Sequence, residues 1–278
     1  MIAFRIVNVF TVGGDPFSGN PLCVVEDARG LEPEQMQSIA RQMNLSETTF
    51  VLPSERADAR VRIFTPGFEM PFAGHPTLGT ASVVGEGRDE IDLEMLAGII
   101  TVTRSGDEWT LTAAGAPSAR PAGATRAELA SMLSLDEAAI AGEPLWVHTG
   151  VEQLVIPLRS ADDVRAAKPI PSLLERWGYT ESRHEAMAYV WAPAAEGPWP
   201  VRFFFTSNGA VLEDPATGSA CANLGGWHVV QKRGPLAATL RQGEAVGRPS
   251  ELKLRVDANG AIHVTGAVIA LGRGALDL

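Results

Sequence analysis

The sequence Glu69-Met70-Pro71-Phe72-Ala73-Gly74-His75 has a counterpart in the second half of the chain, Glu213-Asp214-Pro215-Ala216-Thr217-Gly218-Ser219. Both stretches follow the pattern Glu-x-Pro-x-x-Gly. Both come after an apolar run that is typical of a strand, and both precede a predicted helix. This faint internal repeat predicts two pseudo-symmetric lobes, with two helix N-termini that face one cleft.

Length and composition agree with two folded lobes. The chain has 278 residues, of which 45% are hydrophobic and 20% are charged, an ordinary composition for a globular protein. Residues 115–123 are rich in glycine, proline and alanine, which favours a linker at this point. The next stretch, Thr125-Arg126-Ala127-Glu128, has the spacing of a capping box and predicts a helix that opens the second lobe.

Apolar periodicity predicts short strands and a few helices, and hence an α+β fold. An apolar stripe after Pro33 predicts a helix that ends at Asn44. Further helices are predicted after the two repeated stretches. Near the end of the chain, residues 261–265 and 267–271 are predicted as two separate strands.

Charge and apolar runs disfavour several classes of protein. The formal net charge is −10, from 33 acidic and 23 basic residues, and no basic run occurs, so nucleic acid is not an expected partner. The longest apolar runs, such as residues 267–271, are far shorter than the ~20 residues that span a bilayer, so no membrane association is expected. Residues 1–7 resemble a strand rather than a secretory leader. With two isolated cysteines, Cys23 and Cys221, these features predict a cytoplasmic protein.

The usual signatures of metal and cofactor sites do not occur in the sequence. The histidines outside the repeat have no close partner at a metal-ligand spacing; they are His148, His184, His228 and His263. No phosphate-loop motif, Gly-x-Gly-x-x-Gly fingerprint or Gly-x-Ser-x-Gly nucleophile elbow is present. We therefore expect neither a metal nor a nucleotide cofactor.

The two repeated helix starts are the first candidates for chemistry. Backbone amides near Gly74-His75 and Gly218-Ser219 would direct the positive end of a helix at an anion such as a carboxylate. Glycine lets a backbone approach a ligand closely. The alternative is that both glycines only relieve crowding at turns.

Four polar side chains are further candidates. Glu47 lies between a predicted helix and a predicted strand, beside apolar residues. An apolar environment raises the pKa of a carboxyl group, which suits proton transfer at carbon near neutral pH. The alternative is that Glu47 lies in a solvated turn or caps a helix. His75 lies in a Gly-His-Pro turn, where a structural hydrogen bond is the alternative. Asp214 either forms a turn or anchors a substrate amine. Ser219 either caps its helix or acts as a nucleophile, which needs a base beside it.

Together these residues resemble the PhzF-like phenazine-biosynthesis family, which is related to diaminopimelate epimerase. The matching motifs follow in order along nearly the whole chain: Phe17-Ser18-Gly19-Asn20-Pro21, Asn44-Leu45-Ser46-Glu47-Thr48-Thr49-Phe50, Arg62-Ile63-Phe64-Thr65-Pro66, Pro71-Phe72-Ala73-Gly74-His75-Pro76-Thr77-Leu78-Gly79, Glu213-Asp214-Pro215-Ala216-Thr217-Gly218-Ser219-Ala220, and Gln242-Gly243 with Gly247-Arg248-Pro249-Ser250. The resemblance implies two similar lobes, each a mixed sheet or barrel wrapped around a central helix, with the active site between them. It also implies a homodimer without cofactor or metal.

We expect an N-terminal lobe over residues 1–116, completed by a C-terminal strand at about 267–278, and a C-terminal lobe over residues 125–266.

The resemblance also implies roles for individual residues. In the family's isomerase, the glutamate of the Leu-Ser-Glu motif moves a proton between two carbons of trans-2,3-dihydro-3-hydroxyanthranilate, and here that glutamate is Glu47. The matching motifs imply that His75, Asp214 and Ser219 hold polar groups of the substrate and assist the transfer. The residues that we expect to bind substrate are Asn20, Gly74, Thr217 and Gly218.

We therefore predict a cofactor-independent isomerase of a small carboxylated substrate, with Glu47 as general acid and base. Epimerase and racemase relatives place one cysteine in each lobe, at the turns where this chain has Gly74 and Gly218, so a two-thiol racemase is disfavoured. Three alternatives stay open. They are an epimerase or racemase of an amino-acid-like substrate, a hydrolase that uses Ser219, and a small-molecule-binding protein without turnover.

Overall fold

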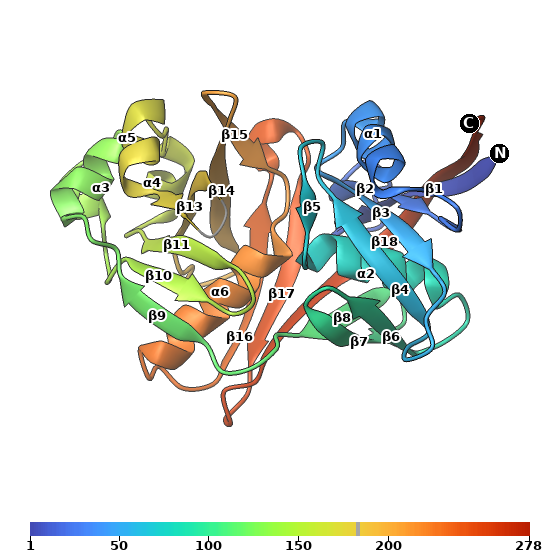
Figure 1. Ribbon diagram of the computed structural model, residues 1–278. Helices are drawn as coiled ribbons and strands as arrows, with labels where there is room; N and C mark the ends of the chain where they lie inside the picture. Colours follow the sequence, from blue (N-terminus) through green and yellow to red (C-terminus); the bar gives the residue numbers. More distant parts are fainter. Residues whose placement is uncertain (182–183) are drawn as a thin grey trace. The chain divides into compact units, whose positions relative to one another are not determined.

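The chain divides into two structural units. A computed structural model describes residues 1–181 and 184–278 (Figure 1). Unit 1 comprises Met1–Thr112 and Thr265–Leu278, and unit 2 comprises Ala113–Val264. Within the described residues, no helix combines the length and the apolar character needed to cross a membrane.

Unit 1 contains a closed ring of paired strands. Its strands are β1 (Ile2–Val9), β2 (Asn20–Val25), β3 (Glu47–Leu52), β4 (Ala59–Phe64), β5 (Glu69–Met70), β6 (Glu90–Met95), β7 (Gly98–Ser105), β8 (Glu108–Thr112) and β18 (Ile262–Leu276), which begins in unit 2. Pairing runs from β18 through β1, β2, β3, β4, β6, β7 and β8 and returns to β18. The β2–β3 and β4–β6 pairs are parallel, and β5 forms a short antiparallel hairpin with β4.

Helix α2 (Gly74–Val84) is the buried helix of unit 1. Residues 74–81 are all buried, and the helix contacts β1, β2, β3, β4, β6, β7 and β8. Its circumference lacks the charged face of a surface helix, as expected for a helix enclosed by strands. Gly79 permits this packing, because a Cβ there would lie only 2.6 Å from the Cδ2 atom of Leu22.

Helix α1 (Pro33–Met43) packs on the opposite face of β3. Its buried residues form a core with Phe50 and Phe64. Pro33 occupies the first helical position, and Asn44 ends the helix with a left-handed φ of 53°. The predicted start and end of this helix are confirmed.

Unit 2 places a second set of strands around a second buried helix, α6 (Gly218–Val230). Its strands are β9 (Ser118–Pro121), β10 (Leu145–His148), β11 (Glu152–Pro157), β12 (Tyr179–Thr180), β13 (Glu185–Trp191), β14 (Trp199–Ser207), β15 (Ala210–Asp214), β16 (Leu236–Gln242) and β17 (Ser250–Val256). Pairing runs in the order β9, β10, β11, β13, β14, β16, β17, and the β11–β13 and β14–β16 pairs are parallel. In addition, β15 pairs with β14, and β12 pairs with β13. Helix α6 contacts β9, β10, β11, β16 and β17.

Short helices complete unit 2. They are α3 (Arg126–Met132), α4 (Ala161–Ala166), α5 (Pro171–Trp177) and the 3₁₀ turns η1 (Glu137–Ala139) and η2 (Glu244–Val246). The predicted capping box at the start of α3 is confirmed: the Glu128 amide donates to the Thr125 hydroxyl, and the Thr125 amide donates to the Glu128 carboxylate. The predicted α+β fold, with two similar lobes that each wrap a mixed sheet around a central helix, is also confirmed.

The structure corrects two local predictions. Residues 115–123 are not simply a linker, because Ser118–Pro121 form β9 and pair with β10. All four side chains of β9 are exposed, so no apolar alternation marks the strand in the sequence. The two C-terminal strands are one strand, β18, that runs through Gly266. A Cβ at Gly266 would lie 2.1 Å from the Phe10 ring, so this glycine makes room for Phe10.

Candidate active site

Glu47 begins β3, immediately after the chain leaves α1. Its neighbour on β2 is Leu22. Because side chains alternate along a strand, Glu47 lies on the same face as Thr49, whose hydroxyl accepts a hydrogen bond of 2.8 Å from Thr80 of α2. The Glu47 carboxylate is therefore on the α2 side of the ring, where only 15% of its side chain is exposed.

His75, the second residue of α2, brings an imidazole to this carboxylate. Its Nε2 lies 3.5 Å from the Glu47 Oε2, and its Nδ1 lies 3.5 Å from the Asn20 Nδ2. The ring also donates a hydrogen bond to the Pro21 carbonyl. Burial lowers the pKa of His75 to about 3, although the bond to Pro21 opposes the shift. The imidazole is therefore uncharged near neutral pH, and its contact with Glu47 is not an ion pair.

The first turn of α2 presents backbone amides next to these side chains. The N-cap residue Ala73 makes no side-chain cap, and Pro76 has no N–H. The amides of Gly74 and His75 precede the first intrahelical hydrogen bond, which Thr77 donates to the Ala73 carbonyl at 3.2 Å. In unit 1 the structure thus brings together four of the predicted site residues: Asn20, Glu47, Gly74 and His75.

In unit 2, Asp214 and Thr217 are joined at the start of α6. Asp214 ends β15, and its Oδ2 accepts a hydrogen bond of 2.5 Å from the Thr217 hydroxyl. Gln242 of β16 supports both residues: its Nε2 donates to the Asp214 carbonyl at 2.9 Å and to the Thr217 hydroxyl at 3.0 Å. Its Oε1 accepts from the Thr217 amide at 3.3 Å. The Asp214 carboxylate is thus tied by a hydrogen bond to Thr217, the N-cap residue of α6.

Ser219 lies inside α6 and does not cap it. The N-cap residue is Thr217, and Gly218 is the first helical residue. The Ser219 hydroxyl is partly buried and accepts a hydrogen bond of 3.0 Å from Gln153 Nε2 of β11. Gln153 in turn accepts from Asn223, one turn further along α6. Asp214, Thr217, Gly218 and Ser219 thus all lie within one short segment at the start of α6.

Three residues of the hydrogen-bond networks around these candidate residues were not identified from the sequence. Gln242 belongs to the matching motif Gln242-Gly243, but its contacts with Thr217 and Asp214 could not be foreseen. Gln153 and Asn223 belong to no motif, and each meets a partner far away in the chain. Both are fully buried polar side chains, and this burial with their hydrogen bonds distinguishes them in the structure.

Neither cysteine has the environment of a catalytic thiol. Cys23 lies in β2 and Cys221 in α6, and both are fully buried. Burial raises the pKa of Cys23 to about 12 and raises that of Cys221 even further. The prediction against a two-thiol racemase gains support from these positions. In the part of the chain that the structure describes, no three His, Cys, Asp or Glu side chains group as a metal site.

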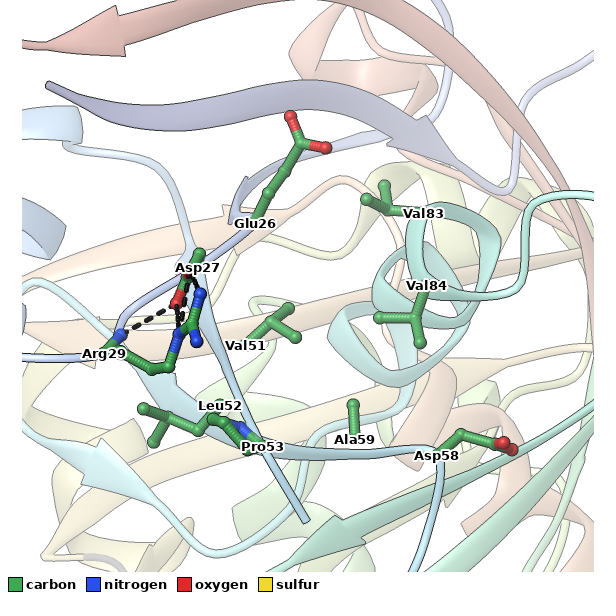
Figure 2. Close-up of a pocket in the computed structure, with 10 residues that line it drawn as sticks. All are labelled: Glu26, Asp27, Arg29, Val51, Leu52, Pro53, Asp58, Ala59, Val83 and Val84. Atoms are coloured by element: carbon green, nitrogen blue, oxygen red, sulfur yellow. Dashed lines mark hydrogen bonds and ion pairs between the residues drawn. The ribbon is translucent and has the colours of Figure 1, made fainter.

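A cavity of about 340 Å³ in unit 1 lies away from these residues (Figure 2). The last residues of α2 line it, whereas His75 lies in the first turn of that helix. The lining residues are Glu26, Asp27, Arg29, Val51, Leu52, Pro53, Asp58, Ala59, Val83 and Val84. Asp27 is paired with Arg29, and Glu26 with Arg5. None of the predicted site residues therefore lines this cavity.

Comparison with known proteins agrees with the motifs. The model of the family described as phenazine biosynthesis-like protein (PhzC-PhzF) matches residues 7–274. The chain belongs to this family. It is 38% identical to an uncharacterized isomerase of Pasteurella multocida, over 99% of this chain and 93% of that protein. It is 33% identical to the trans-2,3-dihydro-3-hydroxyanthranilate isomerase of Pseudomonas aeruginosa, over 97% of this chain and 98% of that protein. These relatives support an isomerase activity for this family member.

Solved structures share the fold. The PhzF-family protein of Bacillus anthracis superposes with a TM-score of 0.86 at 24% identity, over 100% of this chain and 99% of that one. A predicted epimerase of Pseudomonas aeruginosa superposes with a TM-score of 0.80 at 28% identity, over 99% of both chains. A probable proline racemase of Agrobacterium radiobacter has the same fold, with a TM-score of 0.65 at 13% identity, over 100% of this chain and 93% of that one.

Proposed function

We propose that the protein is a cofactor-independent isomerase that moves a proton between two carbons of a small carboxylated substrate, with Glu47 as the general acid and base. The observation that carries the proposal is the contact between a largely buried carboxylate and a buried, uncharged imidazole, 3.5 Å apart. A single carboxyl group can remove a proton from one carbon and return it to another, provided that bulk water is excluded.

The proton and the electrons balance without a co-reactant. The Glu47 carboxylate removes a proton from the first carbon and becomes a carboxylic acid, while the electron pair of the broken C–H bond delocalises into the substrate. Glu47 then donates the proton to the second carbon, where the electron pair forms a new C–H bond. The carboxylate is regenerated, so one residue completes the cycle.

An uncharged His75 suits this cycle. An imidazolium 3.5 Å from Glu47 would stabilise the carboxylate and so weaken it as a base. A neutral ring avoids this loss of basicity, and its Nε2 faces the Glu47 Oε2, so the ring can position the carboxyl group. We propose that His75 orients Glu47 and contacts the substrate.

The residues of unit 2 that match the family motifs also have proposed roles in binding the substrate. Asp214 and Ser219 hold its polar substituents, and the amides at the start of α6 favour a carboxylate or a developing negative charge. The proposed substrate-binding residues are Asn20, Gly74, Thr217 and Gly218. We also propose a homodimer, which light scattering of the purified protein tests.

The first experiment is an assay with trans-2,3-dihydro-3-hydroxyanthranilate, the compound in the name of the Pseudomonas aeruginosa relative. Conversion is followed by ultraviolet absorbance and by uptake of solvent deuterium. We expect Glu47→Gln to lower the rate by ~10²–10⁴-fold, because it removes the general acid and base. Full turnover by Glu47→Gln contradicts the mechanism. Tight binding without proton exchange in the wild type identifies a binding protein instead.

An epimerase of an amino-acid-like substrate is the second candidate. The observation in its favour is the similarity to the predicted epimerase of Pseudomonas aeruginosa, at 28% identity over 99% of this chain. The buried Cys23 and Cys221 do not offer the two thiols of a cysteine-based racemase. Solvent deuterium at the α-carbon of an amino acid, with no shift of a double bond, identifies this activity.

A further inference from the structure

A buried chain of hydrogen bonds ends on Ser219. The Thr149 hydroxyl donates to Asn223 Oδ1 at 2.7 Å, and Asn223 Nδ2 donates to Gln153 Oε1 at 2.8 Å. Gln153 Nε2 then donates to Ser219 Oγ at 3.0 Å. Gln153 and Asn223 are fully buried, and Thr149 is 6% exposed. All three hydrogen bonds point the same way, toward Ser219.

Local geometry fixes this direction. Ser219 and Asn223 are four residues apart in α6, so both project from one face of the helix toward Gln153 of β11. The Asn223 amide is held at both ends, because its Oδ1 accepts from Thr149 and its Nδ2 also donates to the Val151 carbonyl at 2.8 Å. Rotation of the Gln153 amide by half a turn would place its Nε2 donor against the Asn223 Nδ2 donor, and rotation of the Asn223 amide would place its Oδ1 against the Val151 carbonyl, in a buried site.

We infer that Gln153 and Asn223 are positioning residues that hold Ser219 as a hydrogen-bond donor toward the substrate. The inference rests on the proposed function in one respect, namely that Ser219 contacts the substrate. The Gln153 N–H group cannot accept the Ser219 proton, so this proton is directed to another acceptor, such as a substrate carboxylate. A nucleophilic serine needs a neighbouring base that accepts its proton, whereas Gln153 donates a hydrogen bond to the Ser219 oxygen. The arrangement therefore argues against a hydrolase that uses Ser219.

A thiol at position 219 reports the direction of the Gln153 hydrogen bond without any measurement of turnover. In Ser219→Cys, an N–H donor and the N-terminus of α6 both stabilise the thiolate, so we expect a thiol pKa at least about one unit below the ~8.5 of a free cysteine. Adding Gln153→Met removes the donor, and we expect this pKa to rise again by about one unit. Alkylation by iodoacetamide at pH 7 then slows roughly tenfold, because the thiolate fraction falls.

The native cysteines are internal controls for the alkylation. Burial raises the pKa of Cys23 to about 12 and that of Cys221 still higher, so the thiol introduced at position 219 reacts first. Thr149→Val, which removes the first donor at nearly constant volume, serves as a second variant if Gln153→Met does not fold. We expect it to shift the thiol pKa in the same direction by a smaller amount.

A double-mutant cycle on the active enzyme separates positioning from general stability. We expect Gln153→Met to lower kcat/KM about tenfold in the wild type and to have no further effect in Ser219→Ala, since it acts through Ser219. Equal losses in both backgrounds, or a thiol pKa in Ser219→Cys that neither Gln153→Met nor Thr149→Val changes, overturn the inference. If no substrate is turned over but the thiol pKa shifts as expected, the proposed function fails and the positioning role stands.

Discussion

The starts of α2 and α6 are built on similar scaffolds. Before α2, Arg62 of β4 forms a two-point ion pair with Glu69, with both hydrogen bonds at 2.7 Å. Before α6, Arg202 of β14 forms the matching pair with Glu213, at 3.1 and 2.6 Å. In both units the guanidinium also lies over a phenylalanine ring, and a buried helix then begins at a glycine. The internal repeat in the sequence therefore corresponds to a repeated structural support.

The two helix starts differ at their second residue. In unit 1 this residue is His75, a buried and uncharged imidazole next to Glu47. In unit 2 it is Ser219, a partly buried hydroxyl that accepts a hydrogen bond from Gln153. One duplicated scaffold can thus carry two roles, which we propose to be proton transfer in unit 1 and hydrogen-bond donation to the substrate in unit 2.

Replacing these two residues should affect different kinetic constants. We expect His75→Gln to lower kcat by ~10²-fold, because the ring orients the proton-transferring carboxyl group. We expect Ser219→Ala to change KM more than kcat, by about tenfold, because it removes one hydrogen bond to a bound group. Steady-state kinetics on a substrate that the wild type converts measures both. If the two variants give the same pattern, the division of roles between the units is wrong.

The two ion pairs should differ in their contribution to stability. The Arg202–Glu213 side chains are 16% and 8% exposed, whereas those of Arg62–Glu69 are 17% and 23% exposed. Arg202→Met leaves the more buried carboxylate without its partner, so we expect it to lower the free energy of unfolding by about 3 kcal/mol, and Arg62→Met by roughly half as much. Urea denaturation measures both values.

A surface pair is the control for this comparison. Arg159 pairs with Asp163, but the arginine is 59% exposed, so we expect Arg159→Gln to change the unfolding free energy by less than about 0.5 kcal/mol. A loss for Arg62→Met that exceeds the loss for Arg202→Met would show that burial does not set the order.

Each unit also contains one buried histidine that makes stability depend on pH. Burial lowers the pKa of His75 to about 3, and burial with the nearby Arg233 charge lowers that of His228 to about 4. Both rings are uncharged in the folded protein but become protonated below a pKa of about 6.5 once the chain unfolds. The unfolded state thus binds more protons, and stability falls as the pH drops below 6.5.

The expected slope is up to ~1.4 kcal/mol per pH unit for each histidine. The contribution of His228 changes between pH 6.5 and about 4, and that of His75 continues to about 3. Urea denaturation at pH 6.5, 5.5 and 4.5 measures the slope in the wild type, in His75→Gln and in His228→Gln. We expect each variant to lose about half of it; equal stability at pH 6.5 and 4.5 in the wild type contradicts this account.

Local signals in the sequence were sufficient for several elements. Pro33 and Asn44 delimit α1, and Thr125 with Glu128 begins α3, because capping depends on residues within one turn of the helix. In unit 2 the candidate residues also come from one contiguous motif, which is why the structure finds them close together. In unit 1, Asn20, Glu47 and His75 come from three separate motifs and meet only through tertiary contacts.

Features that depend on tertiary contacts were not predictable in this way. Strand β9 exists because it pairs with β10, although its own residues are exposed and include a proline. The roles of Gln153 and Gln242 follow from hydrogen bonds to residues far away in the sequence. The uncharged state of His75 depends on its burial inside the ring of strands, which a Gly-His-Pro motif does not reveal.

The most direct test of the account follows the proton itself. A substrate that the wild type converts is labelled with deuterium at the carbon that loses its proton, and the reaction is run in ordinary water. The account predicts that part of the label appears at the accepting carbon in the wild type, and that Glu47→Gln lowers the rate by at least ~10²-fold. Undiminished turnover by Glu47→Gln, with no label at the accepting carbon in either protein, would contradict proton transfer by Glu47.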